Sequence, residues 1–434
     1  MGPGRQSLLR GAALVGALIL LAAAGAWFLE NTIPRRIVIA SGVPDGLYHQ
    51  YAQRYAKILA RDGVTLEERA TNGAADNALL LTDPKSGVDV AFMQAGVVPE
   101  ADRDKIVMLA SLYYEPLWVF YRGNAALTEL DQLRYKKIAI GVPGQGVRAF
   151  LEPLLAANNV TGFNSELLPL TNVEALRALQ AGTIDAAAFV GGVQAAAIFQ
   201  ALHDPSLKLM SLVRADAYPR RFAYISKLVL PAGTVDLGLR IPPEDVTLIA
   251  TDAMLVARPD LPAPIVNLLY EAAREVHSGQ GYFEARHEFP NTDPEDLPVS
   301  VDADRHHRFG PSFLQRTLPF SMATYVERLI IVLIPLVVVI VPLMNIVPQL
   351  LRWRVRSRVY RWYGELAMLE HDVAARTGTL PIDKWLADLD RIEAGAARIK
   401  TPSSYASEAY TLREHISLVR RSVLAKADVQ QAAT

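Results

Sequence analysis

Short apolar runs alternate with longer amphipathic stretches through the first half of the chain. Eight runs rich in β-branched or other apolar residues are predicted as strands: residues 37–40, 64–69, 88–92, 106–112, 117–121, 137–140, 167–170 and 185–190. Between them, apolar residues recur at helical spacing in five stretches: residues 47–60, 75–81, 147–157, 173–181 and 193–201. Strands that alternate with helices in this way are typical of βα units, so we expect an α/β fold with mainly parallel sheets.

The βα units form two sets, one on each side of residues 117–123. This arrangement predicts a domain over residues 31–325 with two lobes joined by crossing strands. Lobe 1 would take about residues 35–118 and 250–320, and lobe 2 about residues 119–249. The apolar run at 246–257 is the predicted return crossing. An amphipathic helix at 262–276 is expected to pack back on the first lobe.

Two long stretches, residues 11–28 and 329–351, carry no charged residue. As a helix the second would be roughly 35 Å long, which is enough to cross a bilayer, and we predict a transmembrane helix there. The first follows Arg5 and Arg10 and contains a small-residue segment at 22–24, as a cleavable signal peptide does. Because Trp27 and Phe28 extend the apolar run, we favour an uncleaved signal anchor over residues 1–30, and the signal peptide stays the alternative.

Arginines gather directly after the second apolar stretch, within residues 352–361, whereas only Arg328 is close before it. The positive-inside rule then places the tail, residues 352–434, in the cytoplasm and the preceding domain on the periplasmic side of the inner membrane. Basic and aromatic residues together at 353–363 favour contact with the lipid bilayer. The tail itself shows three helical stretches, at 353–375, 382–399 and 405–425, which predict a small helical hairpin.

Composition narrows the possible chemistry. A net charge of −1 argues against a nucleic-acid partner. The chain has no cysteine, which excludes disulfides, cysteine-ligated metals and thiol nucleophiles. The motifs of serine hydrolases, zinc proteases and P-loop nucleotide-binding proteins do not occur, and the eight histidines are scattered. We therefore expect no enzyme, no cofactor and no metal site.

Four segments share one design, in which a strand is followed by a glycine-containing turn and a helix. They are SGVPDGLY at 41–48, ATNGAADN at 70–77, GVPGQGVR at 141–148 and VGGVQ at 190–194. A helix N-terminus offers unpaired backbone N–H groups and a partial positive charge, and glycine lets a ligand approach that backbone. The turns lie at the carboxyl ends of parallel strands, where ligands bind in open α/β sheets. Two turns from each lobe would line one cleft.

The candidate ligand-binding residues lie in and beside these turns. They are Ser41, Gly42, Gly46, Tyr48, Asn72, Asn77, Gln94, Gly144, Gln145, Gly146, Val147, Arg148, Gly191 and Gly192. Arg148 near a helix start would fork onto a carboxylate, although a surface arginine gives the same pattern. A single glycine turn is common in any α/β protein, so the prediction rests on four turns that divide two and two.

At these residues the chain resembles the TAXI family, the solute-binding subunits of tripartite ATP-independent periplasmic (TRAP) transporters. The resemblance covers about residues 36–276, and the elements that carry it, in order, are SGVPDGLY, TNGAADN, DVAFMQ, IAIGVPGQG and IDAAAFVGG. The positions that match the family pattern are Gly42, Tyr48, Asn77, Gln94, Gly144 and Gly146. A C-terminal apolar stretch with a short tail also resembles a membrane-anchored subgroup.

The resemblance implies a type II periplasmic-binding-protein fold that closes by hinge motion on its ligand. It also implies a small anionic ligand, namely a dicarboxylate, a keto acid or an acidic amino acid, and a TRAP-type permease as partner. An alternative function is a ligand sensor that passes lobe closure to a partner bound to the helical tail.

Overall fold

The computed structural model describes residues 16, 19–21, 23–25, 27, 34–44, 46–293, 296–318, 320–375, 381–397 and 406–432. Two compact units divide the chain, an α/β unit within Ile19–Leu329 and a helical unit that contains Ile330–Thr434. The predicted N-terminal anchor lies largely outside the described residues, and Asp45 of the first turn also lies outside them.

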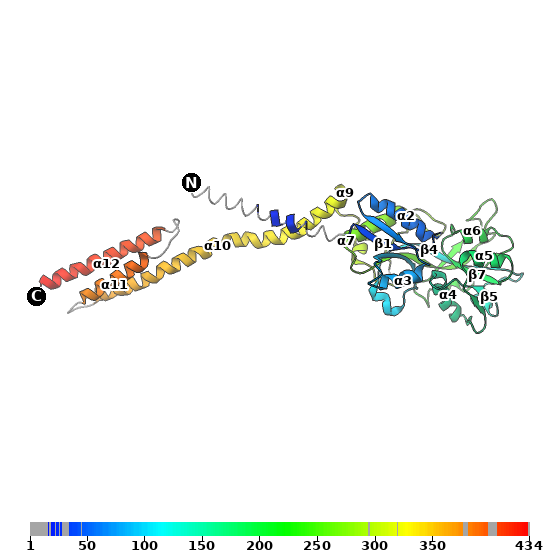
Figure 1. Ribbon diagram of the computed structural model, residues 1–434, viewed down its shortest axis with the longest axis horizontal. Helices are drawn as coiled ribbons and strands as arrows, with labels where there is room; N and C mark the ends of the chain where they lie inside the picture. The colour runs from blue at the N-terminus through cyan, green and yellow to red at the C-terminus, as the bar shows by residue number, and fades with distance from the viewer. Residues whose placement is uncertain are drawn as a thin grey trace. The chain divides into compact units, whose positions relative to one another are not determined.

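The first lobe of the α/β unit is built on three parallel strands, β1 (Arg36–Ala40), β2 (Thr65–Arg69) and β3 (Val90–Gln94). Helices α2 (Leu47–Ala60) and α3 (Ala74–Thr82) connect them, and Figure 1 shows both helices beside β1. Tyr55 and Leu59 of α2 are fully buried in one core cluster with Ile37 and Ile39 of β1. The predicted βα pattern is therefore confirmed for this lobe.

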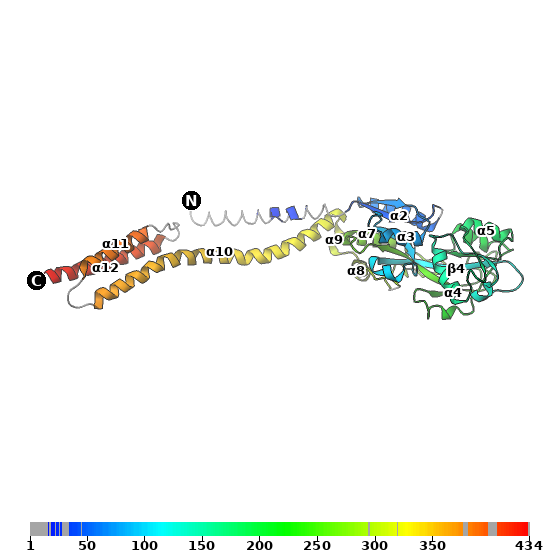
Figure 2. The same ribbon diagram turned by 60° about the horizontal axis from the view of Figure 1, so that its bottom comes forward.

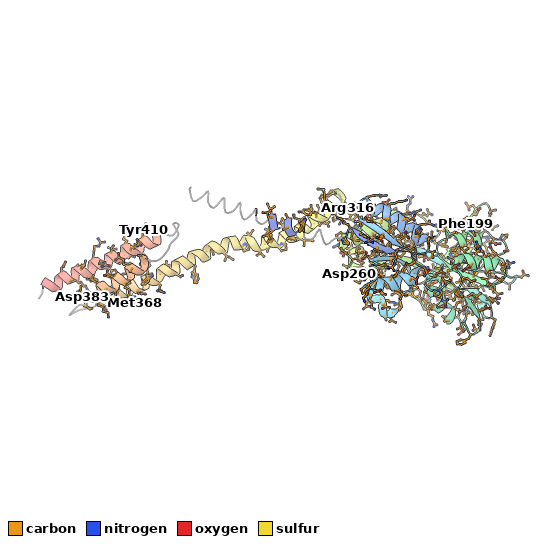
Figure 3. The ribbon with its side chains drawn as sticks, viewed as in Figure 1. Phe199, Asp260, Arg316, Met368, Asp383 and Tyr410 are labelled. Carbon is orange, nitrogen blue, oxygen red and sulfur yellow. The ribbon has the colours of Figure 1, made fainter. Side chains whose placement is uncertain are left out.

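The second lobe repeats the design with β5 (Lys137–Ala139), β6 (Glu166–Leu168) and β7 (Ala186–Val190), which run parallel. Its helices are α4 (Gly146–Ala157), α5 (Asn172–Gln180) and α6 (Ala196–Leu202), and Figure 2 shows α4 and α5 in this lobe. Phe199 on α6 marks the second lobe in Figure 3, and Asp260 marks the first. Two short strands that the sequence analysis did not predict, β8 (Lys208–Leu209) and β9 (Ser226–Leu230), complete the lobe.

Two long antiparallel strands, β4 (Val107–Tyr121) and β10 (Val246–Ala257), run through both lobes. The C-terminal half of β10 pairs with β3, whereas its N-terminal half pairs with β9, and the end of β4 pairs with β7. The return crossing at 246–257 is thus confirmed. The prediction of separate strands at 106–112 and 117–121 was wrong, because the polar segment between them continues one strand.

The sheet order is β2-β1-β3-β10-β4-β7-β5-β6, with β8 paired to β4 and β9 to β10. Since β4, β8, β9 and β10 are antiparallel to their neighbours, the sheet is mixed and not mainly parallel as predicted. β4 leads from the first lobe into the second and β10 leads back, so these two crossing strands run in opposite directions.

Helix α7 (Ala263–His277) covers the first lobe and buries Ile265, Leu268 and Leu269 in the same core as α2, as predicted for residues 262–276. Two further helices follow, α8 (Val301–Phe309) and α9 (Phe313–Thr317). Three short 3₁₀ helices lie in connections: η1 (Glu100–Lys105), η2 (Leu130–Leu133) and η3 (Ala215–Ala217).

The helical unit contains α11 (Ile382–Ala397), α12 (Ala406–Ala432) and the part of α10 (Phe320–Ala375) that begins at Ile330. Trp385 and Leu389 of α11 are buried against Leu412 and Ile416 of α12 and Leu366 of α10. The predicted helical hairpin is confirmed, but residues 329–351 and 353–375 form one continuous helix and not two. Within the described residues, no helix combines the length and the apolarity that crossing a membrane requires.

A candidate ligand-binding cleft between the two lobes

A cavity of about 120 Å³ lies between the lobes and is lined by residues from both of them. Nine of the predicted site residues line it: Gly42, Gly46, Tyr48, Asn72, Gln94, Gln145, Gly146, Val147 and Gly191. They come from all four predicted turns and from the end of β3. The structure therefore brings these nine residues together at one cavity, and their contact with a ligand stays a prediction.

Among the helices that begin at this cavity, α2, α3 and α4 have no side-chain cap at the N-terminus. Gly46, Gly73 and Gln145 are the residues before α2, α3 and α4, and no side chain of theirs accepts a hydrogen bond from the first turn. By contrast, Thr171 before α5 accepts a hydrogen bond from the backbone N–H of Glu174. Uncapped N-termini leave backbone donors available to an acceptor in the cavity.

The two lobes touch across the cleft. The backbone N–H of Asp76 in α3 donates to the carbonyl oxygen of Gly144, 3.4 Å away in the second lobe. A Cβ atom on Gly146 would stand 1.7 Å from Oε1 of Gln94, and one on Gly73 would stand 3.6 Å from Gly144 and Gln145. A side chain at Gly146 would therefore displace the Gln94 side chain or move the lobes apart, whereas a Cβ at Gly73 would make an ordinary contact with the second lobe.

Glu115 of β4 is the acidic residue of the cavity wall, and it is only 4% exposed. Its carboxylate accepts hydrogen bonds from the hydroxyls of Tyr48 and Tyr113, at 3.1 and 3.0 Å. Burial raises the pKa of Glu115, while hydrogen bonds from the side chains of Gln94, Tyr113 and Tyr48 oppose the shift. The wall thus holds a buried carboxylate supported by neutral donors.

Five predicted residues lie outside this cavity. They are Ser41, Asn77, Gly144, Arg148 and Gly192. Gly144 lies at the lobe contact described above, and Gly192 lines a second cavity. The other three are held by partners within the fold.

Asn77 and Ser41 form part of the first lobe's internal bonding. Both amide hydrogens of Asn77 donate to backbone carbonyls, those of Ser41 and Phe92, and its Oδ1 accepts from the Thr71 hydroxyl. The Ser41 hydroxyl donates to Glu68, 2.5 Å away. Because these groups are used inside the lobe, the prediction that they contact the ligand has no support in the geometry.

Arg148 forms an ion pair with Glu152 one turn along α4, with Nη2 and Oε1 at 2.9 Å. Both side chains are partly exposed, and neither lines the cavity. The surface-arginine alternative therefore fits this structure better than a carboxylate clamp.

The sequence analysis missed Glu115 as a site residue, together with Asn172 and Leu47. An acid within the apolar segment LYYEPLWVF, residues 112–120, was the available signal for Glu115. A charged residue in a buried strand needs partners, and such residues concentrate at functional sites.

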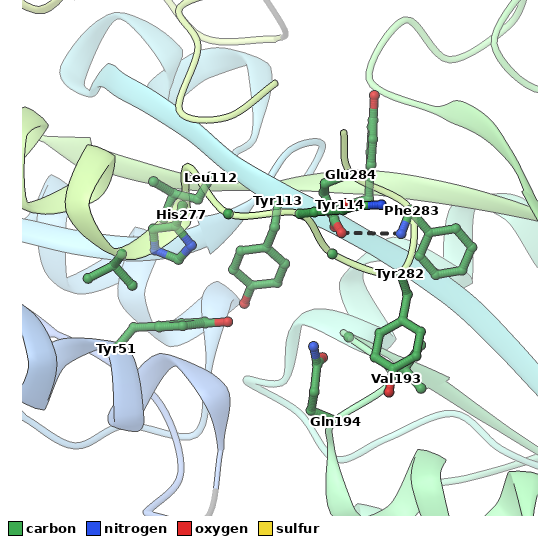
Figure 4. A pocket seen from close by; sticks show the side chains of 15 residues that line it. Tyr51, Leu112, Tyr113, Tyr114, Val193, Gln194, His277, Tyr282, Phe283 and Glu284 are labelled. Atoms are coloured by element: carbon green, nitrogen blue, oxygen red, sulfur yellow. Dashed lines mark hydrogen bonds between the residues drawn. The ribbon is translucent and has the colours of Figure 1, made fainter. Parts of the chain in front are cut away.

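A second cavity of about 170 Å³ lies beside the hinge. Figure 4 shows that the polar ends of Tyr51, Tyr113 and Gln194 point toward the same space. His277 belongs to its wall, and its Nε2 has no hydrogen-bond partner among the described atoms. Burial, with a smaller effect of Arg54, lowers the pKa of His277 to about 3, so this imidazole is neutral at pH 7.

Asp252 lies at the hinge itself, where β10 pairs its position with Tyr114 of β4. The residue is 5% exposed, and burial raises the pKa of its carboxyl to about 7. A hydrogen bond from Ser111 lowers this pKa, and the nearby acids Glu288, Asp293 and Glu115 raise it. The crossing strands therefore carry a carboxyl that titrates near neutral pH.

A cavity enclosed by two α/β lobes that share a pair of crossing strands defines a two-lobed, periplasmic-binding-protein-like fold. The model of the NMT1-like family matches residues 39–288, which is more than half of the 434 residues. The chain belongs to the NMT1-like family, and the fold is of the solute-binding kind. The narrower resemblance to the TAXI family stays a prediction.

Solved structures similar to the chain include two binding proteins and a third protein whose name states no ligand. An ancestral arginine-binding protein bound to arginine is 12% identical, covers 58% of this chain and 96% of its own, and has a TM-score of 0.37. The periplasmic aliphatic sulphonate binding protein SsuA from Escherichia coli is 14% identical over 56% and 70%, with a TM-score of 0.36. A protein of Bordetella bronchiseptica RB50 is 12% identical over 64% and 98%, with a TM-score of 0.41.

Proposed function

We propose that the α/β unit is an extracytoplasmic solute-binding domain that captures a small carboxylate-bearing metabolite in the cleft between its lobes. The observation that carries the proposal is the cavity into which three uncapped helix N-termini open from two lobes. A carboxylate there accepts backbone N–H bonds and meets the positive ends of the helix dipoles. Membership in a family of the solute-binding kind supports binding over catalysis.

In this proposal, ligand binding is linked to closure of the two lobes around the cleft. The contacts between Gly146 and Gln94 and between Asp76 and Gly144 join the lobes only when the cleft is shut. A ligand that bridges the turns at 42–48 and 145–147 adds contacts to both lobes and so favours the closed arrangement. As the resemblance to TAXI proteins implies, the partner that receives the solute is a TRAP-type permease.

A second candidate function is sensing, and one observation favours it. Helix α10 runs without a break from Phe320, at the end of the α/β unit, to Ala375 in the helical unit. A continuous helix is a suitable element to link lobe closure to a partner bound by α11 and α12. A ligand-dependent change in partner binding to the helical unit would favour sensing over transport.

Thermal unfolding of the full chain with a panel of small carboxylates tests the proposed binding function. A ligand at a hundred times its dissociation constant stabilises the folded state by about 2.7 kcal/mol, which is a clear rise in melting temperature. No rise with any carboxylate of the panel would contradict the proposal. A solute uptake assay with and without a TRAP-type permease distinguishes transport from sensing.

A further inference from the structure

The cleft contains a buried acid and no basic side chain. Among the residues that line the cavity in the described part of the chain, Glu115 is the one carboxylate, and none is lysine, arginine or histidine. Of the described residues, none forms an ion pair with Glu115. A buried carboxylate without a cationic partner is unfavourable unless a ligand supplies the charge.

Around Glu115 and Gln94, hydrogen-bond acceptors outnumber donors. A carboxylate accepts about four hydrogen bonds, and Glu115 receives those of Tyr48, Tyr113 and Gln94. Gln94 is 5% exposed, and its Oε1 has no partner among the described atoms although it lies against the start of α4. One acceptor direction of Glu115 is therefore left for a donor from outside the protein, whereas the Gln94 oxygen is covered by the start of α4.

We propose that the solute carries a protonated amine that binds Glu115, in addition to the carboxylate held by the helix N-termini. An ammonium group has three donors and no acceptor, so it matches the unfilled acceptor direction of the Glu115 carboxylate. A dicarboxylate without a hydroxyl group, or one with a keto group, offers only acceptors beside Glu115. It also places further negative charge next to this carboxylate. The inference rests on the proposed binding function and narrows its ligand to amino acids.

A purely structural role for Glu115 makes a different prediction. In that role the carboxylate would only hold the rings of Tyr48 and Tyr113, and its loss would weaken every ligand to the same degree. Recognition of an ammonium group instead weakens only ligands that carry one. Matched ligands that differ in the amino group therefore separate the two roles.

Isothermal titration of the full chain with three matched pairs tests the inference: L-alanine and propionate, L-aspartate and succinate, and L-glutamate and glutarate. The amino member of at least one pair should bind about tenfold or more tightly than its partner, as a charge-assisted bond predicts. Glu115→Gln should remove this difference by weakening the amino member, with the des-amino member unchanged or tighter. Glu166→Gln is the matched control, because Glu166 is an exposed residue of the edge strand β6 and forms an ion pair with Lys137 of β5.

The outcomes are distinguishable. Tighter binding of a des-amino member by the wild-type chain overturns the inference and leaves the binding function in place. Equal weakening of both members by Glu115→Gln assigns Glu115 a structural role and also overturns it. No binding of any of the six compounds contradicts the proposed carboxylate function itself. The melting temperature of Glu115→Gln shows that the variant is folded, and Tyr48→Phe, which removes one donor to Glu115 and keeps the carboxylate, should retain the preference for the amino member.

Discussion

Gln94 at the end of β3 and Gly146 at the start of α4 meet across the cleft, so closely that a Cβ on Gly146 would stand 1.7 Å from the Gln94 Oε1. The two residues belong to different lobes, so their contact joins the lobes in this structure. A glycine is required at position 146 by this approach and not by a left-handed backbone, since its φ is not positive. The contact makes closure testable by substitution.

Gly146→Ala should hold the cleft partly open and weaken ligand binding by about tenfold or more, because the closed state would acquire a steric clash. Each lobe should remain folded, since the added methyl group points at the other lobe. Isothermal titration measures the affinity, and small-angle scattering measures the closure. Gly162→Ala is the control, because a Cβ at Gly162 meets no atom within 4 Å. Unchanged affinity in Gly146→Ala would contradict closure as part of binding.

Asn77→Ala should destabilise the fold by roughly 2–4 kcal/mol, because two backbone carbonyls and the Thr71 hydroxyl lose their buried partner. Asn77 is fully buried at the start of α3, where its side chain ties β1 to β3. Urea unfolding measures the effect. Under conditions in which the variant is still folded, its affinity for the ligand should stay near that of the wild type.

A direct ligand contact by Asn77 would give the opposite result, with a large loss of affinity and little loss of stability. Asn124→Ala serves as the control for stability, since the side chain of Asn124 is exposed in a loop of the second lobe. Its change in unfolding free energy should lie within about 0.5 kcal/mol.

The position of the cleft could be predicted from the sequence because its signals are local. A strand, a glycine turn and a helix start lie next to one another in the chain, and parallel strands bring such turns to one edge. Nine of the fourteen named residues line the cavity for this reason. The roles of Ser41, Asn77 and Arg148 could not be assigned in the same way, because their partners decide whether a polar group is free.

The role of Glu115 could not be predicted from local sequence signals. Its partner Tyr48 lies 67 residues away along the chain, so no local pattern indicates that their side chains meet in the cleft. The continuity of β4 is a similar case, since the polar residues within it resemble a break. Pairing with β10 on one side and with β7 at its end keeps the strand extended, and these are long-range contacts.

Asp252→Asn should change how stability depends on pH. The pKa of Asp252 is raised to about 7 from an ordinary value of 3.8, so the folded state holds a proton that the unfolded state has lost between these values. The free energy of unfolding should therefore fall as pH rises from about 4 to about 7, by at most roughly 4 kcal/mol at about 1.4 kcal/mol per pKa unit. In Asp252→Asn the side-chain amide does not titrate, so this fall in the free energy of unfolding should be absent.

Melting temperatures between pH 4 and pH 8 check this prediction. Asp252→Asn should exceed the wild type at pH 8 and approach it near pH 4. The control Asp260→Asn lies in the exposed connection between β10 and α7 and should follow the wild type at each pH. Parallel curves for Asp252→Asn and the wild type would show that the hinge carboxyl does not titrate in this range.

His277→Phe should change how stability depends on pH at acidic pH. The contribution of His277 has the opposite sign to that of Asp252, because it is lost as the pH falls. Burial lowers the pKa of His277 to about 3, so the imidazole stays neutral in the folded state while the unfolded chain takes up a proton below its ordinary value of 6.5. The stability is therefore complete above pH 6.5 and is lost as pH falls from 6.5 toward 3. Phenylalanine has no proton to gain, so the variant should lose less stability over this interval.

The aromatic surroundings make phenylalanine a suitable replacement. The His277 ring stacks on Tyr113 with centroids 5.6 Å apart and lies 4.6 Å from the ring of Tyr51, and a phenyl ring keeps these contacts. Urea unfolding at pH 7 and pH 4.5 gives the two free energies that are needed. His203→Phe, at the exposed end of α6, is the control and should lose stability with acid as the wild type does. An equal loss in His277→Phe and the wild type would mean that His277 is already protonated or exposed in the folded protein.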